Sequence, residues 1–334
     1  MKISRRGLFI AGAAAGAAAG QAGAPAPPRP VPGRRFTGAA LEQIAFPLGG
    51  IGTGTVSLGG YGNLRDWEIY NRPHKGSITP FTFVALRLEG GGLKKPLVRV
   101  VQRQPHPPFT GRDGVPRDTG LGLPRFREAA FTGAYPFAEI AFTDARLPVE
   151  VSLEAFNPMI PLDTDESSLP VAIFTYRVRS RAASKIDAAL AFSLMNTVGF
   201  DGVTALRNRN AAFFGQNTGE FRREPDLCGL LLASRKYPQD SARYGSLAVL
   251  APAGDVSYRL QWERGSHFDE FQKWWDEFHD RGRFPSADAP PSADGTTEYT
   301  TLASHFSLGP NESKDLTFVL AWHFPNGENY WTRD

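Results

Sequence analysis

The stretch 148-PVEVSLEAF-156 alternates apolar and polar side chains along its length. In an extended chain, Val149, Val151, Leu153 and Ala155 point to one side, and the glutamates and the serine between them point to the other. This period-two alternation predicts a strand with one face buried and the other in water.

Similar segments recur along most of the chain. They span residues 81–88, 97–103, 138–143, 172–178, 186–194, 246–251, 256–262, 301–308 and 316–322. Clusters of Gly, Pro, Asn and Asp separate them, and the 35 glycines and 27 prolines among 334 residues exclude a coiled coil. Many strands in close succession predict a mainly β fold, a large antiparallel β-sandwich.

One segment has a helical period instead. Phe268, Phe271, Trp275 and Phe278 recur at intervals of three and four residues. This spacing predicts one amphipathic helix over about 266–281.

The ends of this helix and its two adjacent tryptophans allow further expectations. Ser266 followed by Asp269 is typical of a capping box, and Gly282 can end the helix. Neighbouring helical residues point about 100° apart, so one stripe cannot bury both tryptophans fully. We expect Trp275 to pack on the sandwich and Trp274 to stay partly exposed, on a surface where a further domain docks.

The first 37 residues read as a leader and a linker. Residues 1–24 contain Arg5 and Arg6, an Ala/Gly-rich run and the small residues 22-AGA-24. This order predicts a twin-arginine-type signal peptide, and hence export to the periplasm or beyond. Residues 25–37 include the run PAPPRPVP and predict an extended Pro-rich linker.

The net charge of +3 comes from this leader, which holds three basic residues and no acidic one. Without it, basic and acidic residues are equal in number, so we expect no nucleic-acid partner. We also expect no stable membrane span, because the Ala/Gly run is less apolar than a spanning helix requires. Cys228 is the single cysteine, which excludes intrachain disulfides, and its leucine neighbours predict a small buried side chain.

Several polar motifs resemble catalytic or ligand-binding motifs, but their spacing and neighbours do not match such sites. The loop 49-GGIGTG-54 has no G-x-G-x-x-G register and no lysine at Walker spacing, so it predicts a tight turn between strands. Ser57 lacks the setting of a nucleophile elbow. No H-E-x-x-H pair occurs, so we expect satisfied or solvent-facing side chains at all six histidines: His74, His106, His267, His279, His305 and His323.

Asp163, Asp165 and Glu166 are the most conspicuous carboxylates. Glycoside hydrolysis needs two carboxyl groups on opposite sides of a bond, about 5–10 Å apart. Three acids within four residues of a Pro-flanked loop are more typical of groups that cap turns. We therefore predict no catalytic, cofactor-binding or metal-ligating residue in this chain.

Several segments, in order along the chain, resemble glycoside hydrolase family 116. That family contains the bile acid β-glucosidase, also called non-lysosomal glucosylceramidase, and bacterial β-glucosidases. The resemblance covers roughly residues 40–325. The segments are 45-AFPLGGIGTGT-55, 62-GNLRDWEIYN-71, 79-TPFTF-83, 135-YPFAEI-140, 155-AFNPMIPLD-163 with 168-SLP-170, and 321-AWHFP-325.

The resemblance implies a two-part protein. In this family an N-terminal β-sandwich precedes an (α/α)6 barrel, and the barrel holds the glutamate nucleophile and the aspartate acid/base of a retaining mechanism. Residues 38–325 would then be the sandwich, and residues 326–334 a truncated junction to a catalytic domain absent from this chain. Neither catalytic carboxylate can be carried over to a position here. His323 departs from the acidic residue that relatives often carry before Phe-Pro.

On this reading the full-length protein is a secreted enzyme that needs no cofactor. It hydrolyses β-glucosides or glycolipids through a covalent glycosyl-enzyme. Two alternatives stay open: a self-standing, non-catalytic carbohydrate-binding or structural β-sandwich, and an enzyme with its own site inside residues 38–325. The 24 Phe, 9 Tyr and 6 Trp suit both sugar stacking and core packing.

The leader gives a testable prediction. Replacing Arg5 and Arg6 together with lysine is expected to abolish export, because the twin-arginine route reads that pair. The measurement is the fraction of the protein in periplasm and medium against that in cytoplasm. Unchanged export of the double variant would contradict a twin-arginine leader.

Overall fold

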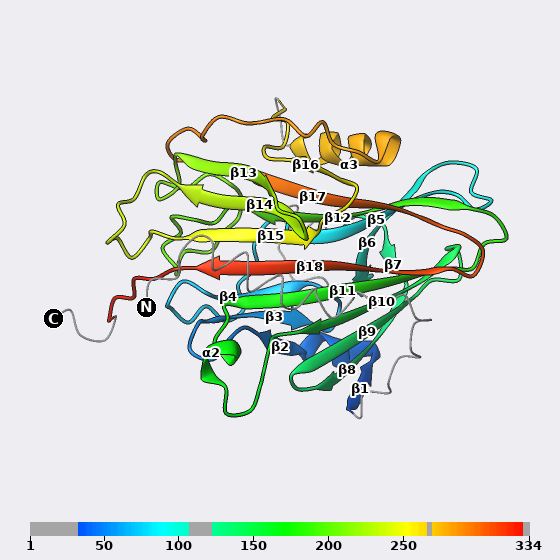
Figure 1. Cartoon of the computed structure of the whole chain (residues 1–334), viewed down its shortest axis with the longest axis horizontal. Helices are drawn as coiled ribbons and strands as arrows, with labels where there is room; N and C mark the ends of the chain where they lie inside the picture. The colour runs from blue at the N-terminus through cyan, green and yellow to red at the C-terminus, as the bar shows by residue number, and fades with distance from the viewer. Residues whose placement is uncertain (1–32, 107–121, 266–268, 330–334) are drawn as a thin grey trace.

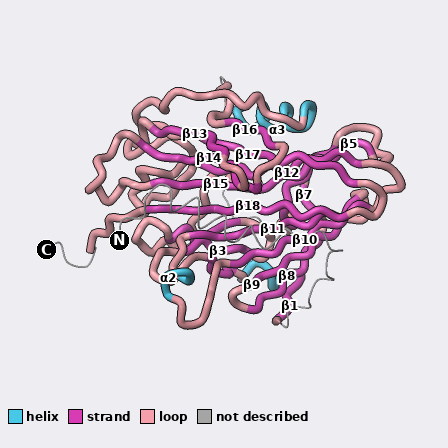
Figure 2. The backbone as a smooth tube through the Cα atoms, in the orientation of Figure 1, coloured by secondary structure: helices cyan, strands magenta, loops and turns pink. Residues whose placement is uncertain are grey.

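The computed structural model describes residues 33–106, 122–265 and 269–329. The predicted signal peptide and residues 25–32 of the predicted linker lie outside this range. Strands dominate the described chain, and the helical pieces are short and peripheral (Figure 2). The mainly β, antiparallel sandwich predicted from the alternation is confirmed.

A nine-stranded sheet forms one layer, in the order β1-β8-β9-β10-β11-β18-β15-β14-β13 (Figure 1). Every neighbouring pair in it is antiparallel. Its strands are β1 Arg34–Thr37, β8 Glu128–Ala134, β9 Phe137–Thr143, β10 Val149–Phe156, β11 Val171–Ser180, β13 Asn217–Arg223, β14 Leu227–Ser234, β15 Ser246–Pro252 and β18 Ser313–His323.

A six-stranded sheet forms the facing layer, in the order β16-β17-β12-β5-β6-β7, and its β6–β7 pair is parallel. A smaller sheet has the order β2-β3-β4. The strands of the six-stranded sheet are β5 Phe83–Gly90, β6 Leu97–Arg103, β7 Arg125–Phe126, β12 Ile186–Met195, β16 Val256–Arg259 and β17 Tyr299–Leu308. Those of the small sheet are β2 Ala45–Leu48, β3 Thr55–Gly59 and β4 Leu64–Glu68. The helical segments are η2 Gly38–Gln43, α2 Thr164–Ser167 and α3 Glu270–Arg281.

The core lies between the two large sheets. On β10 the predicted inward residues are buried and both glutamates are exposed. Phe192 of β12 links the layers, because its ring lies 6.1 Å from that of Phe174 on β11 and 5.5 Å from that of Phe318 on β18. Burial of these apolar faces is the main stabilising contribution to such a sandwich.

One boundary differs from that expected. Strand β1, Arg34–Thr37, pairs with β8, so the sandwich begins inside the predicted linker rather than at residue 38. This short strand does not alternate clearly, which is why period-two patterning missed it. Asn326 and Glu328, in the segment assigned above to a junction, line a pocket together with loops of the sandwich.

The predicted helix is present but shorter. Helix α3 spans Glu270–Arg281, Asp269 is its N-cap without a side-chain cap bond, and the predicted partner Ser266 lies outside the described residues. Gly282 ends the helix in the left-handed region at φ 67°, as predicted.

Trp275 packs against the core as expected, but the expectation that Trp274 stays partly exposed was wrong. Trp274 is only 2 % exposed, whereas Trp275 is half-buried. The indole Nε1 groups of Trp274 and Trp262 each donate to Thr301 Oγ1, at 2.9 Å in both cases. This shared acceptor, together with the ring of Phe278 5.3 Å away, draws Trp274 into the core. Trp274 therefore offers no surface for docking.

A buried ionic cluster fastens the start of α3 to β17. Arg209 pairs with both Glu270 and Glu298, and Arg264 also bonds Glu298. Burial raises the pKa of Glu298 and of Glu270, while the neighbouring arginines act in the opposite direction. The cluster lies beneath a helix end, and we read it as structural.

No helix in the described ranges is long and apolar enough to cross a membrane. Cys228 is a free, fully buried thiol, as predicted, and burial raises its pKa.

His305 on β17 makes stability depend on pH. Its Nε2 lies 2.8 Å from Ser257 Oγ, and Phe284 N donates to that oxygen. In the neutral imidazole this nitrogen can accept the hydroxyl hydrogen of Ser257. Burial lowers the pKa of His305 to about 4, and the charge of Arg283 acts in the same direction.

As pH falls below the ordinary value of about 6.5, the unfolded chain binds this proton first, so the folded state loses stability down to about pH 4. Because the imidazole is only partly buried, we expect a loss of about 1–2 kcal/mol in the free energy of unfolding. His305→Gln should flatten the curve of unfolding free energy between pH 7 and 4. The exposed His323→Gln is the control, and equal slopes in the two variants would contradict the assignment.

Candidate functional site

One end of the sandwich gathers segments that lie far apart in the sequence. Trp322 Nε1, at the end of β18, donates to Thr53 O in the glycine loop at 2.7 Å. Ile51 N of that loop donates to Ser167 O at 2.9 Å. Asn71 Nδ2 donates to Phe324 O at 2.9 Å. Three of the segments through which the sequence resembles a glycosidase family thus meet at this end, on the left in Figure 1: 45–55, 62–71 and 321–325.

The glycine loop 49–54 is a turn between β2 and β3, as predicted. Gly49, Gly52 and Gly54 have positive φ, which glycine adopts at little steric cost. Gly50 serves close approach instead, because a β-carbon there would lie 2.4 Å from Leu169 O. The loop is therefore shaped to rest on the neighbouring chain, and no helix N-terminus follows it to hold a phosphate.

The loop with the three acids lies against the glycine loop. Asp163 Oδ1 accepts a hydrogen bond from Glu166 N at 3.0 Å and caps α2, as the turn-capping interpretation predicted. All three carboxylates, Asp165 included, are exposed. Their arrangement supports a folded loop rather than a cleft between two carboxyl groups.

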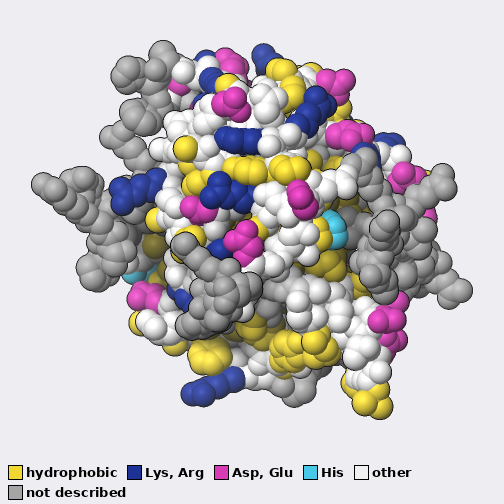
Figure 3. Space-filling view, turned by 90° about the vertical axis from the view of Figure 1, so that its left-hand side faces the viewer, with side chains coloured by type: hydrophobic (Ala, Val, Ile, Leu, Met, Phe, Trp, Pro, Cys, Tyr) yellow, Lys and Arg dark blue, Asp and Glu magenta, His cyan; other side chains and the backbone are white. Residues whose placement is uncertain are grey.

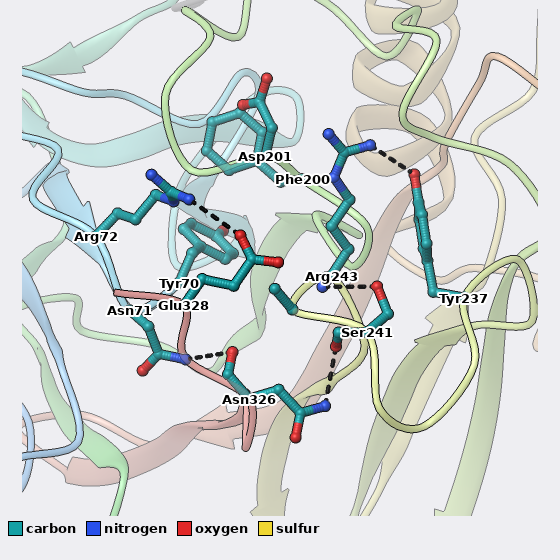
Figure 4. A pocket seen from close by; sticks show the side chains of 11 residues that line it. Tyr70, Asn71, Arg72, Phe200, Asp201, Tyr237, Ser241, Arg243, Asn326 and Glu328 are labelled. Carbon is teal, nitrogen blue, oxygen red and sulfur yellow. Dashed lines mark hydrogen bonds and ion pairs between the residues drawn. The ribbon is translucent and has the colours of Figure 1, made fainter. Parts of the chain in front are cut away.

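A polar pocket of about 370 Å³ is formed by loops of the sandwich (Figure 4). Its walls come from the connections that follow β4, β12, β14 and β18. The lining residues are Tyr70, Asn71, Arg72, Phe200, Asp201, Tyr237, Ser241, Ala242, Arg243, Asn326 and Glu328.

The segment after β18 is tied into this pocket from two sides. Asn71 Nδ2 donates to Asn326 O at 3.1 Å. Asn326 Nδ2 donates to Gln239 O at 2.7 Å and to Ser241 O at 2.9 Å. These bonds fix the wall that carries Glu328, which forms an ion pair with Arg72 at 3.6 Å.

Asp201 is a fixed acceptor on another wall. Its Oδ1 accepts from Val203 N and Thr204 N at 3.0 and 2.9 Å, and its Oδ2 accepts from Thr204 Oγ1 at 2.6 Å. Burial acts to raise the pKa of this carboxyl, but those hydrogen bonds and the charge of Arg243 outweigh it and hold the pKa below its usual range. Asp201 is therefore ionised at neutral pH and suits hydrogen-bond acceptance rather than proton donation.

Aromatic rings complete the pocket. Arg243 Nη1 donates to Tyr237 Oη at 3.2 Å, and its guanidinium carbon lies 5.7 Å from the centre of that ring. Phe200 and Tyr70 meet edge to face at 5.0 Å, and both are buried.

Within the described residues, no group of three or more His, Cys, Asp or Glu could hold a metal ion.

The chain matches the family model of glycosyl-hydrolase family 116 N-terminal domains, described as beta-glucosidase 2, over residues 45–334. The chain belongs to glycosyl-hydrolase family 116. The sandwich described above is the N-terminal domain of that family, as the sequence resemblance implied.

Two solved structures are similar to this chain over part of their length. One is described as a kojibiose phosphorylase from the human microbiome, with 10 % identity, a TM-score of 0.39, and coverage of 87 % of this chain and 31 % of that chain. The other is a polysaccharide lyase, with 10 % identity, a TM-score of 0.36, and coverage of 86 % and 34 %. The family 116 chain thus spans about a third of the length of each.

Sequence reasoning did not find the pocket of this family 116 domain. Asn71 and Phe324 stood in segments that resemble the family, but nothing in the sequence assigned them to one place. Asp201 and Arg243 had no motif signal, because their loops are joined only through the fold. The local signal available was 201-DGVT-204, whose Asp and Gly are typical of a turn.

Gly50→Ala is expected to lower the free energy of unfolding by about 1–3 kcal/mol, because the added β-carbon meets backbone atoms that cannot turn away. Urea unfolding of the variant measures this loss. Gly122→Ala is the control, since nothing lies within 4 Å of a β-carbon there. A Gly50→Ala variant as stable as Gly122→Ala would show that the two loops are not in close contact.

Proposed function

We propose that this family 116 sandwich is the non-catalytic N-terminal part of an exported, retaining β-glucosidase or glucosylceramidase-like enzyme. The match of an N-terminal domain model to residues 45–334 carries the proposal. On this proposal, the nucleophile and the acid/base stand in a helical catalytic domain, and the intact enzyme hydrolyses β-glucosides or glycolipids.

The charged groups of the pocket support the proposal that this sandwich is not the catalytic part of the enzyme. A retaining site needs a nucleophile and a proton donor about 5–5.5 Å apart. Asp201 has a lowered pKa and accepts hydrogen bonds from Val203 and Thr204 of its own turn, which is opposite to what a general acid needs. Glu328 is paired with Arg72.

The apolar surface of the loops 49–54 and 157–168 supports contact with a catalytic domain at this end of the sandwich. Ile51 and Ile160 are about half exposed, at 53 and 49 %, and Leu162 is fully exposed. The bond from Ile51 N to Ser167 O holds the two loops together, and that from Ile160 N to Ser167 Oγ orders the loop 157–168 internally. Apolar side chains gather in the lower part of this face, onto which Figure 3 looks. Such surface is typical of a domain contact.

The pocket itself favours a second candidate function. A preformed polar hollow with aromatic walls also suits a self-standing carbohydrate-binding sandwich. The two candidates differ in whether a helical domain with the two catalytic carboxylates acts together with this chain.

The proposal predicts hydrolysis only in the presence of the catalytic domain. The 334-residue chain is expected to release no 4-nitrophenol from 4-nitrophenyl β-glucoside above the buffer rate. A longer form that carries a helical domain after Asp334 is expected to be active. In that form the loops 49–54 and 157–168 should be protected from proteolysis relative to the shorter chain, because they lie in the domain contact.

The variants Asp163→Asn, Asp165→Asn and Glu166→Gln serve as controls in the shorter chain. Clear turnover that one of them abolishes would place an active site in this loop and overturn the proposal. Turnover that survives all three would also overturn it, since the active site would then lie elsewhere in the sandwich.

A further inference from the structure

The pocket of Figure 4 carries opposite charges in equal number. Arg72 and Arg243 stand with Asp201 and Glu328 around one hollow. A bound anion would face two carboxylates, and a bound cation would face two guanidinium groups, so neither gains from the whole lining. A hydroxyl group both donates and accepts, and can therefore pair with either kind of side chain.

We propose that this pocket binds one ring of a neutral saccharide, as a binding subsite that belongs to the sandwich itself. The two arginines supply donors to the ring hydroxyls, and the two carboxylates accept from them. The choice of a β-linked glucose as the sugar rests on the proposed function. The preference for a neutral, hydroxyl-rich ring rests on the pocket alone.

The polar groups are held in place before any ligand arrives. Three hydrogen bonds within its own turn fix the carboxylate of Asp201. Two backbone carbonyls fix the amide of Asn326, and Asn71 holds the backbone next to it. Groups that are already ordered lose little conformational entropy on binding, so weak individual contacts can add up to measurable affinity.

The size and the walls of the pocket agree with a single ring. A volume of about 370 Å³ is at the small end of ligand pockets, which span about 300–1,000 Å³. Tyr70 and Phe200 are buried behind it, and Tyr237 forms a half-buried wall. A ring that carries C–H groups on its faces and hydroxyls on its edge matches aromatic walls with polar groups between them.

The test is a titration of the full chain with cellobiose, in which saturation-transfer difference NMR measures binding. Saturable binding is expected. Arg243→Gln should weaken it about tenfold or more, because it removes charge-assisted donors to the ligand. Glu328→Gln, which removes the negative charge and replaces one accepting carboxylate oxygen by an NH2 donor, should weaken it in the same direction. Arg235→Gln is the matched control, since Arg235 is exposed on the same β14–β15 connection and does not line the pocket.

Absence of saturable binding, or equal affinity in Arg243→Gln and Arg235→Gln, would overturn the assignment. If inorganic phosphate displaced cellobiose at a concentration below that of the sugar, the assignment of a neutral ligand would be overturned. Thermal unfolding of each variant shows that the fold is retained. Cellobiose binding by a chain that is inactive on 4-nitrophenyl β-glucoside supports the subsite, whether or not a longer form proves to be active. The proposed subsite and the proposed enzyme function can therefore fail separately.

Discussion

The hydrogen bond from Trp322 Nε1 to Thr53 O joins the central strand β18 to the glycine loop, and the candidate site depends on it. Trp322 is buried, so its indole N–H needs a partner inside the protein. A β-carbon at Gly49 would lie 3.1 Å from the same ring. The glycine-rich loop can approach the indole because Gly49 has no β-carbon. The chain that follows β18 begins next to this contact.

This arrangement couples the sandwich core to the surface at one end. Strand β18 pairs with β11 and β15 in the middle of the nine-stranded sheet, so its end is placed by the core on both sides. The segment 324–328 continues from there and is bound by Asn71 and by the β14–β15 connection. Hydrogen bonds on two sides therefore hold this wall of the pocket against the sandwich.

The helix α3 shows where local pattern and tertiary structure disagree. The three-and-four spacing identified the helix and its stop at Gly282, but not which tryptophan is buried. Thr301 on β17 decides that point, because a polar acceptor inside an aromatic cluster selects the indole that can reach it. The apolar stripe of a helix is broad, so the helix could rotate about its axis by one residue and still bury apolar side chains. The facing strand fixes which rotation is adopted.

The sequence by itself determined the strand faces, because alternation with period two is a local property of the chain and the side it buries follows from hydrophobicity. It also determined the turn at 49–54, the cap at Asp163 and the buried Cys228, each of which depends on near neighbours. Only the tertiary structure decided the strand order, the weakly patterned strands such as β1, and the pocket. Asn71, Asp201, Arg243 and Asn326 come from four connections separated by long stretches of sequence, and side-chain chemistry at one position carries no information about which distant loop will lie beside it.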